Sequence, residues 1–495
     1  MPKDPTDATQ PATDADGGAR GMDFDREVVS GTAAQLIRVV IGLLGVVVFA
    51  VVLGPASFGG ATLVLTIVAI LEQPVFGWAM ACKQRLAAQS ISGGAALVML
   101  TGGTLAWTGI VLGATVLFSP TIMRFTGLQW GWLFVPLLLL TTVLLAALRV
   151  LIEGKGRIGA ATWYETAAAI TTTPLQVCLV LVGYGAYGML GGLTVGAGIL
   201  VPVAVRTFGW KVERPTRTDF QSVWEYARWG IAQSLLGRVF ARLDVLLLGF
   251  LLGPLSVGWY EVAWKVVLPA GIISQVAGGS LMTSVASATG GCGRVTDEKI
   301  AEIRRTLGLG AFLAIPVVFG ALVVGESLLI AVFGAAYRDA TPLLIGLAGF
   351  QVLVTQTTPL LQTLNGVNRI RITVPITAIT LIINAVLGLL LVPEVGAVGV
   401  VIATLVAQLI QYLLSLAAVM ESIGRFVPIT RLLTVETIAG AGMAGLLANI
   451  PGPANTLPVV IGYIVLGGAS YFVLVLALSP EARTFLQKLP IGPCS

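Results

Sequence analysis

The chain has 495 residues, of which 56% are hydrophobic and only 11% are charged, and its net charge is +5. Soluble proteins carry about 25% charged residues, so this chain has too few to cover the surface of several soluble domains. A soluble multidomain enzyme is therefore excluded, and an all-α polytopic membrane protein is predicted. The absence of histidine and the wide spacing of the four cysteines argue against a metal centre or a disulfide framework.

The start of the chain is polar, and the rest is a series of apolar runs. Residues 1–29 are rich in Asp, Thr, Pro and Gly and contain no signal-peptide core, so we expect a disordered acidic tail there. Residues 480–495 are expected to form a second tail. A membrane-spanning helix needs about 20 mostly apolar residues. Fourteen stretches meet this requirement, namely 30–53, 58–81, 92–119, 131–150, 159–182, 186–206, 229–252, 257–280, 306–333, 341–363, 372–392, 397–419, 432–450 and 457–479.

The distribution of Lys and Arg predicts the orientation in the membrane. If the N-terminal tail lies inside, it and the inner segments hold 23 of the 29 basic residues, and the outer connections hold two. Cytoplasmic loops carry the excess of basic residues, so we predict a multi-pass protein of the cell membrane with both termini and both tails in the cytoplasm. The inner connection 207–228 indicates an amphipathic helix on the inner leaflet, with an apolar face of Phe220, Val223, Trp224 and Ala227. Its role as a linker between halves or as a lipid sensor is left open.

Three short motifs occur twice, in the same order. VLGPASFGG recurs as LLGPLSVGW, EGKGRI recurs as NGVNRI, and GYGAYG recurs as PEVGAVG. Six spans separate the copies, so both copies have the same orientation in the membrane, which is a transporter plan. We predict two six-helix lobes, 30–206 and 229–419, joined by the linker 207–228, with two further helices in 432–479.

Catalytic motifs are mostly absent. GYGAYG matches the dinucleotide-binding pattern GxGxxG, but it lies in a short hairpin without the strand that this motif requires. EGKG and GGCGR lack the ending of a phosphate-binding loop, and a chain without histidine lacks the usual general base. We therefore predict that the chain is not an enzyme and needs no cofactor, apart from a coupling ion or the membrane potential.

Charged side chains within the spans are the candidate functional residues, because each costs at least about 2.5 kcal/mol at the membrane centre. The bases are Arg38, Arg238, Arg242 and Lys265, and the acids are Glu72, Glu165, Asp244, Glu261 and Glu326. A structural alternative is that these charges only pair with one another, as Arg38 with Glu72, Glu261 with Lys265, and Asp244 with one of the arginines.

Arg238 and Arg242 favour a functional role. They are four residues apart and share one helix face, with at most one acid expected nearby. Arginine binds phosphate through two parallel hydrogen bonds, so an anionic substrate that bears phosphate would suit this pair.

Three stretches of the chain resemble a known family of transporters. They are LGPLSVGWYEVAWKV, LIAVFGAAYRDATPLL and NAVLGLLLVPEVGAVGVVIAT. Residues 25–480 are similar to the polysaccharide-transporter branch of the multidrug/oligosaccharidyl-lipid/polysaccharide exporter superfamily. The resemblance implies two pseudo-symmetric lobes around a central cavity, in which a lipid-linked phosphate meets the cations of spans one, seven and eight. Here these are Arg38, Arg238, Arg242 and Lys265, and we assign Glu72, Asp244, Glu261 and Glu326 as charge partners or ion-coupling residues.

Members of this branch are similar to flippases that move lipid-linked sugars between leaflets. The resemblance implies that the chain translocates a polyprenyl- or dolichyl-linked oligosaccharide outward by alternating access, as its two lobes rock about the cavity. An ion-coupled drug antiporter and a membrane glycosyltransferase or polymerase are the alternatives. The expected partners are the lipid-linked oligosaccharide, membrane lipids and glycan assembly enzymes, without nucleic acid, and the chain is expected to be a monomer.

Overall fold

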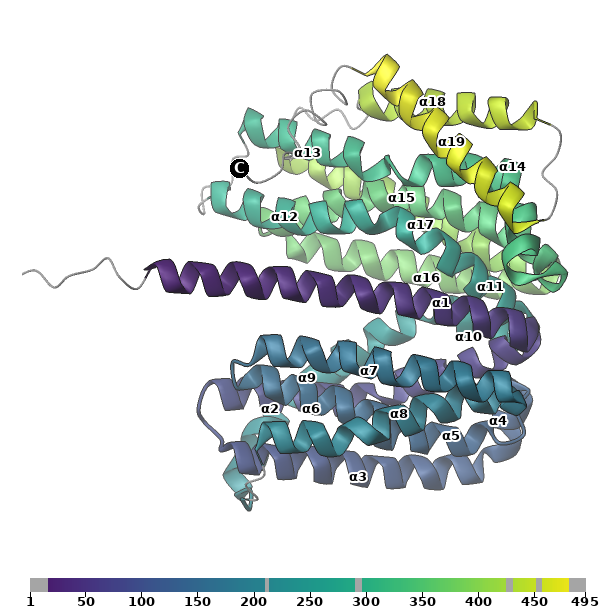
Figure 1. The fold of residues 1–495 in the computed structure, drawn as a ribbon. Coiled ribbons are helices and arrows are strands. Elements are labelled where there is room, and N and C mark those ends of the chain that lie inside the picture. Colours follow the sequence, from purple (N-terminus) through teal and green to yellow (C-terminus); the bar gives the residue numbers. More distant parts are fainter. Residues whose placement is uncertain (1–16, 210–212, 290–295, 424–430, 451–455, 480–495) are drawn as a thin grey trace, which may run out of the picture.

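The computed structural model describes residues 17–209, 213–289, 296–423, 431–450 and 456–479, and every regular element in these ranges is helical. The helices form two bundles, which Figure 1 shows one above the other, with α18 and α19 on the outer side of the second. The first bundle runs from α1 to α8 and the second from α10 to α17. The predicted all-α fold class is confirmed, whereas the central cavity between two lobes stays a prediction.

Glycines and prolines interrupt the helices of the first bundle. Gly54 has φ 68° and divides α1 into two arms, and Pro136 and Pro174 lie a few residues before the π-helical turns η1 and η2. Proline removes a backbone donor and crowds the preceding turn, so it favours such interruptions. The elements are α1 (Gly17–Leu71), α2 (Gln73–Ala87), α3 (Gly93–Leu117), α4 (Ser119–Thr126), α5 (Gly131–Leu138), η1 (Leu139–Val143), α6 (Leu144–Gly154), α7 (Ile158–Leu179), η2 (Val180–Tyr184) and α8 (Gly185–Phe208).

The second bundle repeats this plan. The 3-10 turn η3, which contains Pro269, separates α11 from α12, and Glu72 separates α1 from α2 just before Pro74. The elements are α10 (Leu243–Leu251), α11 (Pro254–Val267), η3 (Leu268–Gly271), α12 (Ile272–Thr289), α13 (Asp297–Ala311), α14 (Ala314–Phe333), η4 (Ala335–Ala340), α15 (Thr341–Gly366), α16 (Ile370–Val395) and α17 (Ala397–Ile423). The remaining helices are α9 (Arg217–Ala241), which packs against α2 of the first bundle, and α18 (Arg431–Ala448) and α19 (Leu457–Leu478), which pack against α14 of the second.

Eleven helical segments of the described residues are long and apolar enough to cross a membrane. The chain is therefore a multi-pass membrane protein, but the number of fourteen crossings is not confirmed. One reason is that residues 159–208 count as a single segment, although two predicted spans meet within it at Gly183 and Gly185, which both have positive φ. Likewise, the single segment Ile41–Leu71 contains parts of the first two predicted spans on either side of Gly54. In addition, α9 and α10, which contain the seventh predicted span, are not among the eleven.

The repeat-related turns VLGPASFGG and LLGPLSVGW pack directly against each other. A Cβ atom added to Gly59 would lie 1.8 Å from the carbonyl oxygen of Pro254, and one added to Gly258 would lie 2.0 Å from that of Pro55. Only glycine permits this approach of two backbones. Because the contact is reciprocal, it agrees with the predicted internal repeat. We call the end of the molecule that carries these turns the turn end.

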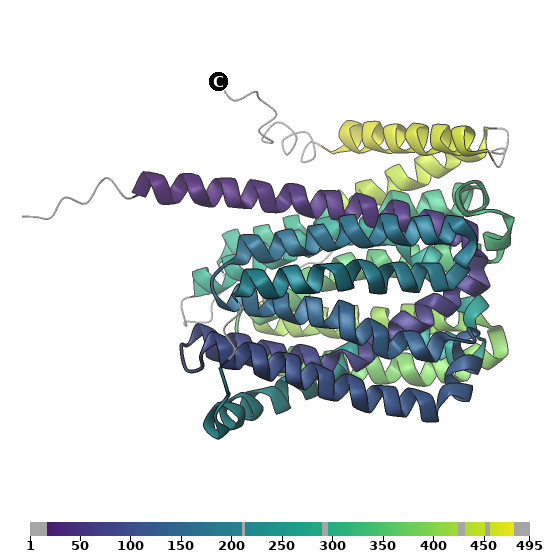
Figure 2. The same ribbon diagram turned by 60° about the horizontal axis from the view of Figure 1, so that its bottom comes forward.

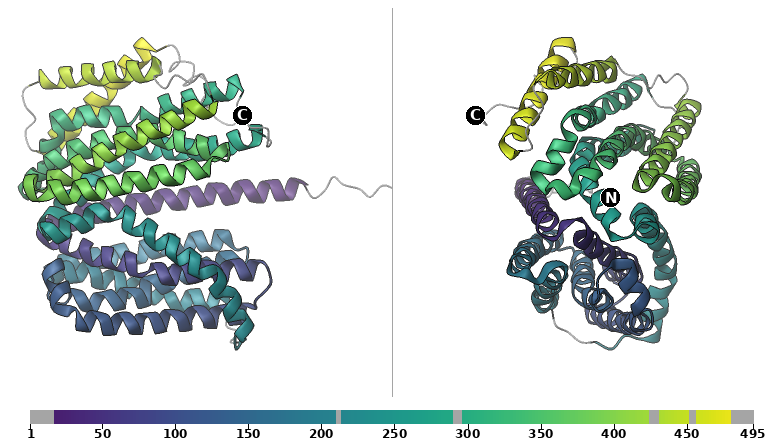
Figure 3. Two further views of the ribbon diagram at one scale, coloured as in Figure 1. Left: turned by 180° about the vertical axis from the view of Figure 1, so that it is seen from behind. Right: turned by 90° about the vertical axis from the view of Figure 1, so that its right-hand side faces the viewer.

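Other contacts also hold the bundles together at the turn end. The hydroxyl of Tyr337 in η4 donates to the carbonyl oxygen of Ala50 in α1 at 3.0 Å, and a Cβ on Gly249 of α10 would lie 2.5 Å from the side chain of Leu63. Seen from the turn end, the two bundles are distinct groups of helices (Figure 3, right). At the opposite end, the first arm of α1 extends beyond both bundles (Figures 1 and 2).

The expected N-terminal tail is partly helical. Residues 1–16 lie outside the described residues, as do residues 480–495, but α1 already begins at Gly17. Residues 17–29 therefore continue the first predicted span. The reason is that this segment contains good helix formers such as Ala, Arg, Met and Glu, and no proline.

The connection 207–228 contains the start of α9, which runs on into the seventh predicted span, and its contact with lipid stays a prediction. α9 begins at Arg217, with a capping box between Thr216 and Asp219, and continues into the seventh predicted span. Val223 and Ala227 are fully buried, because this face of α9 packs against α2. Phe220 and Trp224 of the same predicted face are 52% and 49% exposed, so α2 covers half of that face and leaves the other half open.

Candidate functional site

The seventh predicted span is interrupted at Arg242. This residue has φ −118° and ψ 8° and separates α9 from α10. The two halves have different neighbours, since α9 packs against α2 of the first bundle, whereas α10 packs against α11 and α16 of the second. Charged residues at this interruption therefore lie where the chain passes from one bundle to the other.

Arg238 contacts the first bundle. One turn before the interruption, its Nη2 donates to Oε1 of Glu72 at 3.0 Å. The two side chains are 40% and 27% exposed, so this ion pair is not sealed inside the protein. Arg38, the partner suggested for Glu72, lies in α1, and its side chain is outside the described residues.

Arg242 contacts the second bundle. Its Nη1 donates to Oε1 of Glu261 on α11 at 2.8 Å, with the Glu261 side chain 5% exposed and that of Arg242 34% exposed. The expectation of at most one acid near Arg238 and Arg242 is therefore wrong, because each arginine has its own carboxylate. Glu261 turns towards Arg242, and no ion pair between Glu261 and Lys265 occurs among the described residues.

Asp244 accepts hydrogen bonds from neutral groups and has no arginine partner in the described part of the chain. Its Oδ2 accepts from the hydroxyl of Tyr260 at 2.7 Å and from that of Thr404 at 3.2 Å. Its Oδ1 accepts from the amide of Asn384 at 3.2 Å. These donors belong to α11, α17 and α16, so Asp244 connects α10 to three helices of the second bundle.

Two other predicted site residues lie apart from this group. Lys265 is partly buried on α11, one turn beyond Glu261. Glu326 of α14 forms an ion pair with Arg338 of η4 at 2.8 Å, and both side chains are more than half exposed. Glu326 is therefore the partner of a surface arginine, not of Arg238 or Arg242.

The sequence pattern does not reveal a second charged cluster, which lies inside the first bundle. Arg149 of α6 forms an ion pair with Glu165 of α7 and lies 3.9 Å from Glu153, which binds Lys83 of α2 at 2.7 Å. With Tyr164, Arg149 and Glu165 line a cavity of about 250 Å³ between α6, α7 and α8. Arg149 lies at the end of the predicted span 131–150 and is not among the candidate residues, so the sequence indicates Glu165 without its partner.

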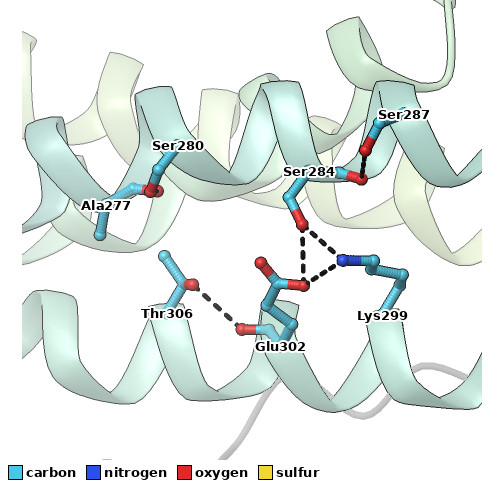
Figure 4. A network of polar contacts seen from close by, with 7 residues as sticks. All are labelled: Ala277, Ser280, Ser284, Ser287, Lys299, Glu302 and Thr306. Carbon is cyan, nitrogen blue, oxygen red and sulfur yellow. Dashed lines mark hydrogen bonds and ion pairs between the residues drawn. The ribbon is translucent and has the colours of Figure 1, made fainter. Parts of the chain in front are cut away.

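A third polar group connects α12 to α13, as Figure 4 shows. The ammonium of Lys299 donates to Ser284 Oγ at 2.5 Å and to Glu302 Oε2 at 2.7 Å, and Ser284 Oγ donates to the same carboxylate at 3.0 Å. Ser280 and Ser287 bond to carbonyl groups of their own helix. This closed network joins two consecutive helices and uses both charges within itself, so its role is structural.

Arg238 and Arg242 are suited to bind an anion. A guanidinium has five N–H donors, and within the described residues each of these arginines uses one, towards its carboxylate. The remaining donors are on partly exposed side chains and can bind phosphate oxygens in pairs. The described residues contain no group of three His, Cys, Asp or Glu side chains that could hold a metal ion.

Two proteins of Haloferax volcanii are similar to the chain in sequence. "Probable flippase AglR" is 27% identical over 350 residues, which is 68% of this chain and 71% of that protein. "Probable low-salt glycan biosynthesis flippase Agl15" is 24% identical over 385 residues, which is 77% of this chain and 80% of that protein. The similarity thus extends over most of the chain.

The fold and a family model agree with the resemblance seen in the sequence. A structure of "Lipid II flippase MurJ" in an inward closed conformation matches with a TM-score of 0.71 and 15% identity, over 92% of this chain and 100% of that one. A structure of a multidrug resistance MATE transporter of the same exporter superfamily, in an inward-facing conformation, matches with a TM-score of 0.58 and 14% identity. The match covers 78% of this chain and 95% of that one. A model described as "Polysaccharide biosynthesis protein" covers residues 48–342, more than half of the chain. The chain therefore belongs to the polysaccharide biosynthesis protein family.

Proposed function

We propose that the chain is a flippase that moves a lipid-linked oligosaccharide from the inner to the outer leaflet by alternating access. The observation that carries this proposal is the position of Arg238 and Arg242 at the interruption between α9 and α10, where the chain passes between the bundles. The names of the two Haloferax relatives and the MurJ-like fold support it. The activity is transport, without a chemical step.

The two arginines bind the phosphate or diphosphate of the substrate. Arg238 is anchored to Glu72 in the first bundle and Arg242 to Glu261 in the second, so a phosphate held by both contacts both bundles. Movement of the bundles changes the separation of the two guanidinium groups, and phosphate affinity therefore depends on the conformation. Arg38 and Lys265 provide further cations for the headgroup.

Both termini lie in the cytoplasm, and the protein is in the cell membrane. The distribution of basic residues supports this orientation. The turn end then faces outward, and the contact of Gly59 with Pro254 closes the passage on that side. The protein acts as a monomer that binds the lipid-linked oligosaccharide and membrane lipids.

Asp244 is the proposed ion-coupling residue, while Glu72, Glu261 and Glu326 are charge partners of arginines. The Asp244 carboxylate accepts hydrogen bonds from Tyr260, Asn384 and Thr404, and the Thr404 hydroxyl also lies 3.4 Å from the amide oxygen of Asn384. A carboxylate among neutral oxygen ligands suits a small cation or a proton.

The experiment uses purified protein in liposomes that contain a fluorescent prenyl-diphosphate oligosaccharide, and a membrane-impermeant quencher reports outward headgroups. Arg238→Ala and Arg242→Ala are expected to abolish flipping with normal expression and insertion, and the lysine variants to recover part of it, because lysine lacks the planar fork. Each charge-assisted hydrogen bond contributes about 1.5–3 kcal/mol, which predicts a loss of about 10- to 100-fold per variant. Arg124→Ala, at an exposed arginine of α4, serves as the control. Normal flipping by both alanine variants would contradict the proposal.

A double variant separates substrate binding from a structural ion pair. Because Glu261 is the partner of Arg242, Arg242→Gln combined with Glu261→Gln leaves no unpaired charge. We expect this variant to fold and to remain inactive. Full recovery of flipping would show that the pair has only a structural role.

A further inference from the structure

A buried carboxyl group in α18 has no partner among the described residues. Glu436 has no exposed surface, and neither of its carboxyl oxygens has a hydrogen-bond partner. It lies in a helix that is long and apolar enough to cross a membrane. An unpaired carboxylate is costly in such surroundings, and in this respect Glu436 differs from the paired acids at Arg238 and Arg242.

The elements around Glu436 are α13, α14 and α19, which all pack against α18. On α19, Tyr471 is within electrostatic reach of Glu436, and its buried hydroxyl likewise has no partner. The ring of Tyr471 packs on Phe312 with centroids 5.6 Å apart. One turn beyond Glu436, a Cβ on Gly440 would lie 2.5 Å from the ring of Phe319, so α14 approaches α18 closely here.

Charged groups on these elements do not neutralise Glu436 in the described structure. Arg304 and Arg305 of α13 form no ion pair with it, and the Nε atom of Arg304 is itself buried without a partner. On α14, the acid Glu326 is bonded to Arg338. The titratable groups on α19 are the phenols of Tyr463 and Tyr471.

We propose that Glu436 is a proton-binding site, and that α18 and α19 dock on the second bundle in this close arrangement only while the proton is bound. The neutral acid fits the apolar interface and can share a hydrogen bond with Tyr471. Loss of the proton would place a charge one turn from the contact of Gly440 with Phe319. Water or a cation must then reach the carboxylate, and α18 must move away from α14 to admit it.

Proton binding at Glu436 thereby controls an apolar cavity. A cavity of about 440 Å³ lies between the second bundle and the α18–α19 pair, and Met443, Leu447 and Tyr463 form part of its wall. Met443 is two turns from Glu436 on the same buried face of α18. Movement of α18 away from α14 therefore widens this cavity, and it does so whether or not the chain is a flippase.

The test measures thermal unfolding of the full chain in lipid nanodiscs between about pH 5 and pH 10. The folded protein holds a proton that the unfolded chain releases, so the Tm of the wild type should fall as the pH rises. Gln has nearly the same shape as Glu and is neutral at every pH. The Tm of Glu436→Gln should therefore fall less with rising pH than the Tm of the wild type. Glu421→Gln, at an exposed glutamate of α17, should behave as the wild type does.

Two outcomes would overturn the proposal. One is the same pH dependence of Tm in Glu436→Gln and in the wild type. The other is an equal loss of stability in Glu436→Gln at every pH, which would mean that Glu436 is ionised and paired, for example with Arg304. If the variant does not fold, hydrogen exchange of the α18 amides in the wild type tests the proposal instead. The protection of these amides, corrected for the intrinsic exchange rate, must fall with rising pH, while the protection of the α17 amides stays constant.

Discussion

Replacement of Gly59 or Gly258 by alanine is expected to shift the protein away from the conformation described here. The added Cβ atoms would lie 1.8 Å and 2.0 Å from the carbonyl oxygens of Pro254 and Pro55. A carbon–oxygen contact needs about 3.3 Å, so the turns would have to separate by roughly 1.5 Å. The clashing oxygens belong to the backbone, and no side-chain rotation can relieve the contact. Overpacking of this kind costs about 1–3 kcal/mol, which changes a conformational equilibrium about 5- to 150-fold.

The assay is cross-linking between the two turns. In a cysteine-free background, Ala56→Cys and Leu255→Cys place thiols at exposed positions of the turns, and a short bifunctional maleimide reports their proximity. Each alanine variant should lower the cross-linking rate at least about fivefold, and the double variant should lower it further. Gly102→Ala, where a Cβ meets nothing within 4 Å, should leave the rate unchanged. Equal rates in the wild type and the double variant would refute the reasoning.

Three further predictions concern transport. Cross-linking of residues 54–58 to residues 253–257 should block flipping reversibly, because the turn end can then no longer open; full activity in the cross-linked protein would reject a rocking movement of the lobes. Cysteines placed beside Arg157 and Arg369 should react with an impermeant reagent only from the cytoplasmic side, and labelling of either from outside would reject the proposed orientation. Asp244→Asn should fold normally and make flipping insensitive to imposed cation or proton gradients in liposomes; an unchanged response would remove Asp244 from ion coupling.

Features set by local backbone conformation could be predicted from the sequence. The Gly-Pro motifs correctly indicate the turns at Gly54 and Gly253, because glycine is the residue that adopts positive φ most readily. Pro74 and Pro269 likewise lie at helix interruptions, since proline disfavours a continuous helix, although Pro359 and Pro375 lie inside α15 and α16.

Pairing between helices could not be predicted in this way. Arg238 and Glu72 are 166 residues apart in the chain, whereas spacing rules apply only to residues on one helix. Within one helix the rule also failed, because Glu261 of α11 pairs with Arg242, which lies outside that helix, and not with Lys265. An amphipathic pattern does not show whether the apolar face of a helix meets lipid or protein. The pattern of α9 therefore suggested the inner leaflet and did not reveal the contact with α2.

Some signals in the sequence had a meaning that only the structure reveals. Asn384 and Thr404 are the first and last residues of the longest family-like stretch, and both donate to Asp244. Glu436 is a single acid in an apolar run, and hydrophobicity alone does not show whether such an acid has a partner. That information depends on α14 and α19, which belong to other parts of the chain.

The contact between the two turns is isologous, meaning that the same surface of each copy meets the same surface of the other, as in a two-fold homodimer. A protein of half this length would need a second molecule to form this contact. Any substitution in such a protein would then appear on both sides of the contact. In the fused chain each copy can diverge alone. The positions that correspond to Arg238 and Arg242 in the first copy are Val39 and Leu43. Fusion thus combines a symmetric contact at the turn end with an asymmetric set of charges at the interruption between α9 and α10.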